Sequence, residues 1–266
     1  MTRTAASVEA MLSDLTVNEQ DRPGLLAALA TPDALRPRLD ATVSAAVREY
    51  KRAHGDGDEL KVTVLVTWSC SDPKASGSDP KSSGSVSCHV TALPPLPTSP
   101  VKVEVRGSPR ENAAAKDSSW VASRAPLEAL MRSDINELLL ATDSGELLEG
   151  SQTNFFALVD GAVHTAGDGV LAGTVRRLLL EVCEREGIPV VLRPPRLEDA
   201  GRWEGALISS TSRLALPIDQ LFVPREGHPS DESDLRVEFA NGPGSLAARL
   251  RALVRDEVVA HSTEIA

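Results

Sequence analysis

The strongest constraint on the fold is a series of short apolar segments that alternate with helical segments after residue 100. Five of the apolar segments have the β-branched and apolar composition of strands: VKVEVRG, NELLLAT, TNFFALVD, GIPVVLR and GALISS. Residues 174–187 and 245–261 instead repeat apolar side chains at three- and four-residue spacing, which predicts two helices. Strands and helices that alternate in this way indicate an α/β or α+β fold.

The first part of the chain has a different pattern and predicts a smaller lobe. Residues 1–59 repeat apolar side chains at helical spacing, and the β-branched run at 60–68 predicts a buried strand. A tandem seven-residue repeat, DPKASGS followed by DPKSSGS, lies within 71–87 and lacks the apolar residues of a core. We therefore predict an N-terminal α/β lobe over 1–92, with 71–87 as a flexible insertion at a hairpin tip.

A proline-dense stretch separates the two patterns. Residues 93–100 read LPPLPTSP, and proline removes backbone donors and favours extended geometry. This composition predicts a linker, with a ligand for an SH3-type domain as the alternative. Residues 101–266 then form the larger C-terminal lobe.

Composition and charge exclude several classes of protein. The 266 residues carry a formal net charge of −10, which disfavours nucleic-acid binding. No apolar run is long enough to cross a membrane, and the N-terminus lacks the apolar core of a secretory signal. The three scattered cysteines predict neither a disulfide framework nor a metal site, and they suit a cytoplasmic location. Cys88 and His89 are neighbours on a predicted strand, so their side chains point to opposite faces.

Four segments between residues 116 and 217 carry residues suited to cofactor chemistry. They are ENAAAKDSSW with Lys116, LLEGSQTNFF with Glu149, the turn VLAGTVRR before a helix, and SSTSRLALP. Each has an ordinary structural explanation when it is taken singly. A lysine is usually a surface charge, a Glu-Gly pair a turn, a Gly-Thr pair a helix cap, and Ser or Thr after a strand a local hydrogen-bonding group.

Taken together and in this order, the segments resemble the fold-type IV pyridoxal-phosphate enzymes, or class IV aminotransferases. These include branched-chain and D-amino acid aminotransferases and aminodeoxychorismate lyase. EGSQTNFF at 149–156 matches the family pattern E-x-x-x-x-N-[LF]-F, and DGVLAGTVR at 168–176 is a variant of L-x-G-[IT]-[TV]-R. The third motif is the strand end SST at 209–211, and AAAKDSSW looks like plant and algal members. The resemblance covers about residues 60–266 and is strongest over 111–218.

The resemblance implies pyridoxal phosphate as the cofactor of the larger lobe, and it implies a role for each residue. Lys116 is the expected catalytic residue, because its neutral amine can join the cofactor aldehyde and then act as a general base. Glu149 is expected to keep the pyridine nitrogen protonated. The helix N-terminus and the following strand end are expected to bind the phosphate, through Gly173, Thr174, Val175 and Thr211.

The resemblance also suggests two supporting residues. Asn154 matches the asparagine of the family motif and is expected to brace the loop that carries the glutamate. Arg176 matches the arginine that ends the second motif, and we expect it to form a structural ion pair.

Two features of the family are missing from this chain. Family members carry an H-x-x-R-L helix in the smaller lobe, whose arginine binds the phosphate, but here no histidine precedes His54. The resemblance therefore implies an abbreviated N-terminal lobe, with arginines that are candidates only by charge: Arg36, Arg38 and Arg48. The family also places a tyrosine near the phenolic oxygen of the cofactor. Tyr50 is the only tyrosine here and lies in another segment, while Trp120 follows Lys116 by four residues.

Three functions follow from the resemblance. The first is an aminotransferase that acts on a small amino acid, D- or branched-chain, and a 2-oxo acid. The second is a lyase that uses the same lysine, and the third is a fold-type IV scaffold without catalysis. The resemblance further implies a homodimer, and a plastid location if the natural precursor is longer.

Overall fold

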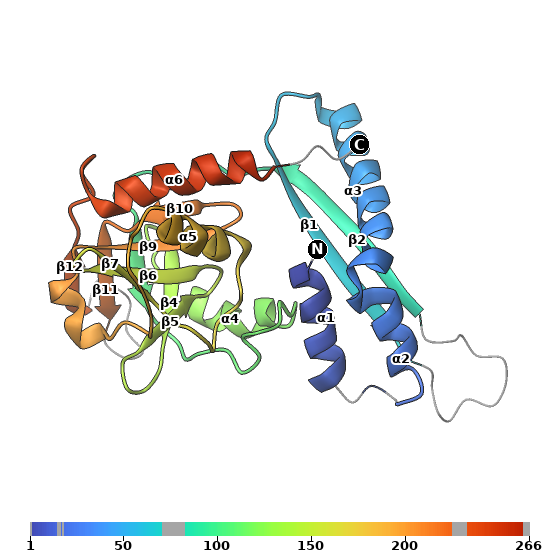
Figure 1. Cartoon of the computed structure of the whole chain (residues 1–266), viewed down its shortest axis with the longest axis horizontal. Helices are drawn as coiled ribbons and strands as arrows, with labels where there is room; N and C mark the ends of the chain where they lie inside the picture. The colour runs from blue at the N-terminus through green and yellow to red at the C-terminus, as the bar shows by residue number, and fades with distance from the viewer. Residues whose placement is uncertain (1, 15–16, 18, 71–82, 225–232, 263–266) are drawn as a thin grey trace. The chain divides into compact units, whose positions relative to one another are not determined.

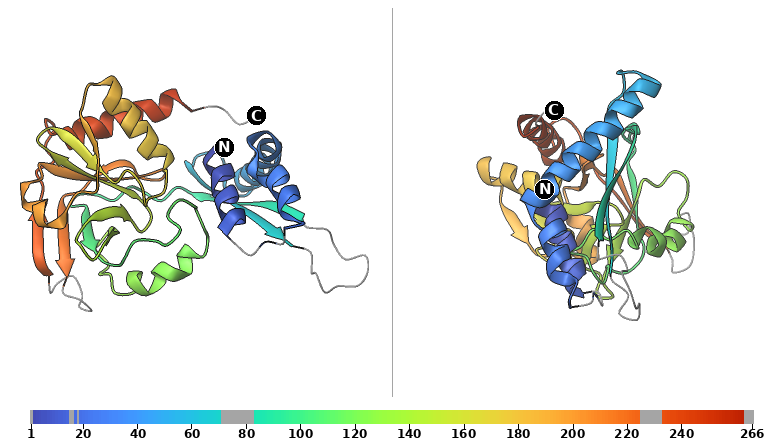
Figure 2. Two further views of the ribbon diagram at one scale, coloured as in Figure 1. Left: turned by 60° about the horizontal axis from the view of Figure 1, so that its bottom comes forward. Right: turned by 90° about the vertical axis from the view of Figure 1, so that its right-hand side faces the viewer.

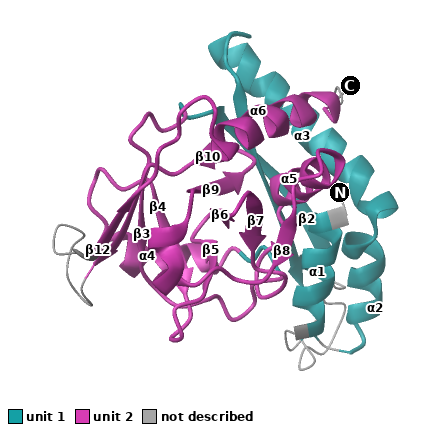
Figure 3. Cartoon of the chain, turned by 60° about the vertical axis from the view of Figure 1, so that its left-hand side comes forward, with its two compact units in different colours: residues 1–95, 115–117, 263–266 teal, residues 96–114, 118–262 magenta. Residues whose placement is uncertain are grey.

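The structure is a computed structural model that describes residues 2–14, 17, 19–70, 83–224 and 233–262. The chain forms two compact units (Figure 3). Unit 1 comprises residues 1–95, 115–117 and 263–266, and unit 2 comprises residues 96–114 and 118–262. The first boundary falls between Pro95 and Leu96, inside the stretch for which a linker is predicted.

Unit 1 consists of helices and one hairpin. Its elements are α1 Thr2–Asp14, α2 Arg22–Leu25, the π-helix η1 Leu26–Ala30, α3 Pro32–His54, β1 Leu60–Ser69 and β2 Ser83–Ala92. Pro32 begins α3, where a missing N–H has no cost, and Gly55 follows its last residue with a φ of 90° that suits glycine. Strands β1 and β2 pair in antiparallel register. The helical pattern predicted over 1–59 and the strand predicted at 60–68 are therefore present, but the strand is not buried as expected: the residues of β1 are half-buried or exposed, with Val62 40% and Leu65 46% exposed.

Helix α3 lies along one face of this hairpin, as Figure 2 shows. The Arg38 guanidinium donates a hydrogen bond of 2.5 Å to the carbonyl oxygen of Gly84 in β2. A Cβ added at Gly84 would lie 2.6 Å from Leu29, so the glycine permits close packing of β2 against η1. Strand β2 begins at Ser83, which corrects the predicted insertion: residues 83–87 are strand, and 71–82 lie outside the described residues.

Unit 2 has, among its described residues, ten strands that form one sheet. Its elements are β3 Lys102–Val105, α4 Trp120–Glu128, β4 Glu137–Ala141, β5 Leu147–Gly150, β6 Asn154–Val159, β7 Ala162–Thr165, α5 Thr174–Arg185, β8 Val190–Leu192, the 3-10 helix η2 Leu197–Arg202, β9 Gly205–Ser210, β10 Leu214–Pro217, β11 Gln220–Pro224, β12 Ser233–Glu238 and α6 Leu246–Ala260. The strand order is β10-β9-β6-β5-β4-β3-β11-β12, with β7 paired to β6 and β8 to β7. Parallel and antiparallel pairs are mixed, as an α/β or α+β fold allows.

The two faces of the sheet belong to different apolar clusters. Phe155 and Phe156 are consecutive in β6 and are both fully buried, and alternation along the strand sends them to opposite faces. Phe156 packs in a cluster with Leu179 of α5 and Leu250 of α6. Phe155 packs in a second cluster with Trp203. Helices α5 and α6 therefore cover one face, and they lie side by side in Figure 1.

Within the described part of the chain, no helix combines the length and apolarity needed to cross a membrane.

Candidate active site

Three adjacent strands of unit 2 carry a row of polar side chains. Glu149 in β5 lies directly opposite Asn154 in β6, and Asn154 lies directly opposite Ser209 in β9. Residues that are directly opposite in neighbouring strands place their side chains on the same face. All three are buried, with exposed fractions of 3%, 5% and 1% respectively. The sheet thus concentrates a carboxylate, an amide and a hydroxyl on one face.

The Glu149 carboxylate is fixed at both oxygens. Arg110 Nε donates to Oε1 at 2.7 Å, and the main-chain N–H of Leu171 donates to Oε2 at 3.0 Å. Both side chains of the ion pair are buried, with 9% of Arg110 and 3% of Glu149 exposed. A charge-assisted pair in such surroundings holds the carboxylate in one orientation.

Arg110 is a site residue that sequence reasoning missed. It lies in the segment between β3 and α4, where its Nη2 donates to the carbonyl oxygen of Ala113 at 3.0 Å. Its guanidinium carbon lies 5.7 Å from the ring centroid of Trp120, within the range of a cation–π contact. The available signal is indirect: a buried glutamate needs a cationic partner, and this arginine lies six residues before Lys116.

Lys116 lies in the same segment between β3 and α4. Its side chain is exposed, and its main-chain N–H donates to Ser7 Oγ of α1 at 3.2 Å. Residues 115–117 belong to unit 1, whereas the other five predicted site residues belong to unit 2.

The start of α5 packs against the row. Asn154 Nδ2 donates to the carbonyl oxygen of Leu171 at 2.8 Å, so the asparagine braces the segment that also bonds Glu149. Gly173 is the N-cap of α5, and a Cβ built there would lie 2.1 Å from Asn154 Oδ1. Thr174 and Val175 open the helix, and the N–H groups of a first turn have no carbonyl partner inside the helix. The structure therefore brings this helix N-terminus next to Asn154.

Replacing Gly173 by alanine should destabilise unit 2 by about 1–3 kcal/mol, because the new methyl group overlaps the Asn154 amide. Denaturant unfolding would measure the change. Gly201 is the matched control, since a Cβ there meets nothing within 4 Å. The loss of unfolding free energy caused by Gly173→Ala should be smaller in an Asn154→Ala background, where the overlapping amide is absent. An equal loss in both backgrounds would contradict this account of Gly173.

The end of β9 completes this region. Ser209 Oγ is buried, and among the described residues it has no hydrogen-bond partner. Thr211 is exposed in the turn between β9 and β10. The main-chain N–H of Arg213 donates to Ser210 Oγ at 3.2 Å, which closes the turn. A buried hydroxyl without a protein partner is uncommon and is consistent with a ligand site.

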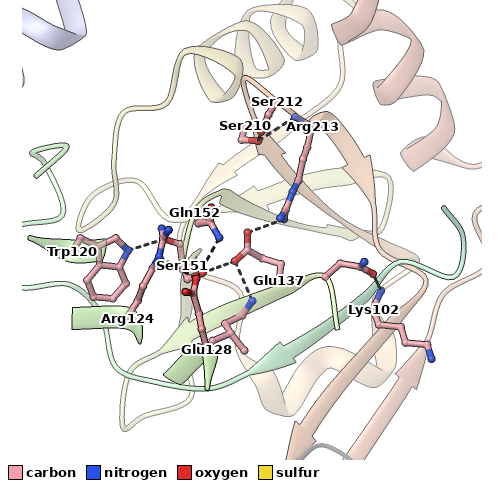
Figure 4. A network of polar contacts seen from close by, with 12 residues as sticks. Lys102, Trp120, Arg124, Glu128, Glu137, Ser151, Gln152, Ser210, Ser212 and Arg213 are labelled. Atoms are coloured by element: carbon pink, nitrogen blue, oxygen red, sulfur yellow. Dashed lines mark hydrogen bonds and ion pairs between the residues drawn. The ribbon is translucent and has the colours of Figure 1, made fainter. Parts of the chain in front are cut away.

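A second buried carboxylate, that of Glu137, contacts the turn after β5 and the turn after β9. Glu137 begins β4 and is 2% exposed. Its Oε1 accepts from Ser151 Oγ at 2.7 Å, and its Oε2 contacts Arg213 Nη1 at 2.9 Å. Figure 4 shows the carboxylate between these two partners. Sequence reasoning missed this residue because a strand-initiating glutamate is ordinarily exposed.

Burial raises the pKa of the Glu137 carboxyl above its ordinary 4.5, against the opposing effects of the Arg213 charge and the hydrogen bond from Ser151. The folded protein therefore keeps this proton at pH values where the unfolded chain has lost it. The free energy of unfolding should fall as pH rises from 4.5 through the raised pKa. Glu137→Gln lacks this titration, so its stability relative to the wild type should rise over the same interval. Denaturant unfolding across pH tests this, and a difference independent of pH would contradict it.

No carboxylate in the described part of the chain pairs with Arg176, for which an ion pair was expected. Its Nη2 donates to the main-chain carbonyl oxygen of Ala166 at 2.7 Å, and burial lowers the pKa of the guanidinium. Its partner is thus a neutral oxygen rather than a carboxylate. The role is still structural, because this bond ties α5 to the segment after β7.

The sequence is similar to known proteins over most of its length. The profile of the family described as amino-transferase class IV matches residues 24–221. Over 158 residues the chain is 26% identical to a protein of Methanocaldococcus jannaschii that is named as a branched-chain-amino-acid aminotransferase. That alignment covers 56% of this chain and 53% of the relative, so the chain spans about half the length of the curated relative that it matches.

Solved structures share the fold. A fold IV-transaminase from Curtobacterium pusillum is 26% identical with a TM-score of 0.60, and the match covers 87% of this chain and 76% of that one. A hypothetical aminotransferase from Mycobacterium tuberculosis, solved in apo, PLP-bound, and alpha-ketoglutarate and PMP bound forms, has a TM-score of 0.63. It is 20% identical, and the match covers 96% of this chain and 84% of that one. These matches confirm the predicted fold-type IV architecture. Because the family profile covers well over half of the sequence, the chain belongs to the class IV amino-transferase family.

Proposed function

We propose that this chain is a pyridoxal-phosphate-dependent aminotransferase that moves an amino group between a small amino acid and a 2-oxo acid. Family membership supports the reaction class. The observation that carries the proposal is the buried row of Glu149, Asn154 and Ser209, with the start of α5 against its middle member.

The residues of this row fit the two polar ends of pyridoxal phosphate. A pyridine nitrogen needs a carboxylate, and Glu149 is a buried carboxylate held by Arg110 and the Leu171 N–H. A carboxylate has about four acceptor positions, so a ring N–H can add to the bonds already formed. A phosphate needs N–H and O–H donors, which the start of α5 and the Ser209 hydroxyl supply.

The bound cofactor would supply an electron sink for the charge that develops at the Cα atom of the amino acid. Glu149 would hold the proton on the pyridine nitrogen. The N–H groups of Thr174 and Val175 would donate to the phosphate with the N-terminal dipole of α5 behind them, and Thr211 would add its hydroxyl. Gly173 would keep this turn close to Asn154.

Lys116 would carry the catalytic amine. Its Nζ would hold the cofactor until the amine of the incoming amino acid displaces it, and the freed Nζ would then remove the proton from Cα. Ala113, three residues before Lys116 in the sequence, is bonded to Arg110, the ion-pair partner of Glu149. The Lys116 side chain is exposed.

The names of similar proteins support the substrate class. The M. jannaschii relative is named for branched-chain amino acids, and the M. tuberculosis protein has been solved with alpha-ketoglutarate. We therefore propose a small amino acid, D- or branched-chain, as the donor and a 2-oxo acid as the acceptor.

The test is an amino-transfer assay on purified protein loaded with pyridoxal phosphate. D- and L-enantiomers of alanine, valine and leucine serve as donors and 2-oxoglutarate as the acceptor, with products separated by chiral chromatography. We expect transfer from at least one donor that requires the cofactor. Retention of the cofactor without transfer from any donor would contradict the proposal. Pyruvate release from aminodeoxychorismate without an acceptor would assign a lyase instead.

A further inference from the structure

We propose that Glu137 is a positioning residue that joins the turn after β5 to the turn after β9, so that Glu149 and the Thr211 hydroxyl keep a fixed spacing. This inference rests on the proposed function, because it assigns the two turns to opposite ends of one cofactor. It concerns residues of unit 2 throughout.

The Glu137 carboxylate divides its oxygens between the two turns (Figure 4). Oε1 accepts from Ser151 Oγ at 2.7 Å and from the main-chain N–H of Leu138 at 3.0 Å. Oε2 contacts Arg213 Nη1 at 2.9 Å. Every one of these partners is a donor, so both oxygens must accept.

The Ser151 contact leads to Glu149. Ser151 lies two residues after Glu149, and it is bonded through its main chain as well as through its hydroxyl. Its N–H donates to the carbonyl oxygen of Leu138 at 2.9 Å, and its carbonyl oxygen accepts from Trp120 Nε1 at 2.7 Å. A Cβ at Gly150 would lie 3.1 Å from Glu137 Cγ, so the turn packs directly on this side chain. The Glu137 side chain is therefore one of the groups that hold this turn in place.

The Arg213 contact leads to Thr211. Arg213 lies two residues after Thr211, and its main-chain N–H donates to Ser210 Oγ at 3.2 Å. Leu214 follows with a φ of 52°, a left-handed conformation that is strained for leucine. Such a conformation persists where the surrounding structure holds it. The pairing of Leu214 with Ser210 contributes to that restraint, and so does the ion pair that holds the preceding side chain, Arg213.

A carboxylate is required at this position for a chemical reason. Glutamine has the same size, but it offers one acceptor oxygen and one amide nitrogen that can only donate. In Glu137→Gln the single amide oxygen cannot accept from both Arg213 and the main-chain N–H of Leu138, and the amide nitrogen can bond only to the Ser151 hydroxyl, which can also accept. In either orientation the charge that pairs with Arg213 is lost while the volume of the side chain is kept.

The experiment is a double-mutant cycle on the Kd of pyridoxal phosphate, measured by absorbance titration of the apo protein. The variants are Thr211→Val, Glu137→Gln and their combination. Thr211→Val should raise Kd about 10-fold in the wild type, because one hydrogen bond to a charged group is lost. In the Glu137→Gln background the same change should raise Kd less than about 2-fold, because the hydroxyl has already left its position. Equal effects in both backgrounds would overturn the inference.

A matched control variant, Glu104→Gln, distinguishes a positioning role of Glu137 from a general loss of stability. Glu104 in β3 is also a buried carboxylate paired with an arginine, Arg106, and is 0% exposed. In the Glu104→Gln background, Thr211→Val should keep its full effect on Kd. If Glu137→Gln does not fold, Arg213→Gln breaks the same ion pair from a side chain that is 19% exposed, and Arg213→Lys should restore part of the coupling.

The outcomes also distinguish this inference from the proposed function. A wild-type protein that does not bind pyridoxal phosphate would overturn both. A wild-type protein that binds it, with additive effects of Thr211→Val and Glu137→Gln, would overturn the positioning role and leave the proposed function standing.

Discussion

Lys116→Ala is expected to lower the kcat of amino-group transfer by about 10⁴-fold or more. The substitution removes both the covalent attachment of the cofactor and the base that takes the Cα proton, and general base catalysis contributes about 10²–10⁴-fold by itself. The Lys116 side chain is exposed, so its removal leaves no buried cavity and folding should be unchanged. Steady-state kinetics, with circular dichroism as the folding control, would measure this.

Lys102→Ala is the control for a general effect of removing a lysine. Lys102 Nζ pairs with Asp134 at 2.7 Å in unit 2, and the proposal gives it no part in the reaction. This variant should keep the rate of the wild type. Added methylamine should restore part of the activity of Lys116→Ala, because a free amine can replace the missing base. Activity of Lys116→Ala close to the wild type would exclude Lys116 as the catalytic residue.

Arg110→Met is expected to destabilise unit 2 by about 3–5 kcal/mol. The change leaves the carboxylate of Glu149 buried without its guanidinium partner, and breaking one side of a buried ion pair has costs of this size. Denaturant unfolding at neutral pH would measure the loss.

The double variant Arg110→Met with Glu149→Gln tests whether the loss of stability comes from the unpaired carboxylate. Removing both charges should recover much of the lost stability, since no unpaired charge stays buried. Activity should not recover, because a neutral amide cannot hold a proton on a pyridine nitrogen as a carboxylate does. Recovery of both stability and activity would mean that Glu149 acts only as the structural partner of Arg110.

The elements with strong periodicity could be predicted from the sequence. Helix α5 was expected over 174–187 and is Thr174–Arg185, and α6 was expected over 245–261 and is Leu246–Ala260. Both have an apolar stripe that packs on the sheet. Strands β5, β7 and β10–β12 were not predicted, because their segments mix apolar residues with Gly, Pro, His or charged residues and lack the continuous apolar runs of the predicted strands.

The residues of the candidate site also differ in whether the sequence could predict them. The motifs identify Glu149, Asn154 and the start of α5, because a turn and a helix N-terminus leave local signals in the sequence. Arg110 and Glu137 leave no such signal. Their importance depends on burial beside a partner that is distant along the chain: Arg110 with Glu149 and Glu137 with Arg213. Glycine was expected at position 173 because it lets the backbone come close to a bound anion. The structure adds a second reason: a Cβ at this position would overlap the Asn154 amide.

The most direct test of the account is the location of the covalently attached cofactor. The protein is loaded with pyridoxal phosphate, desalted, reduced with borohydride and digested, and the labelled peptide is identified by mass spectrometry. The account predicts one stoichiometric label on Lys116, absent from Lys116→Ala and unaffected in Lys102→Ala. No stable label on the wild type, or a label on another lysine, would contradict it.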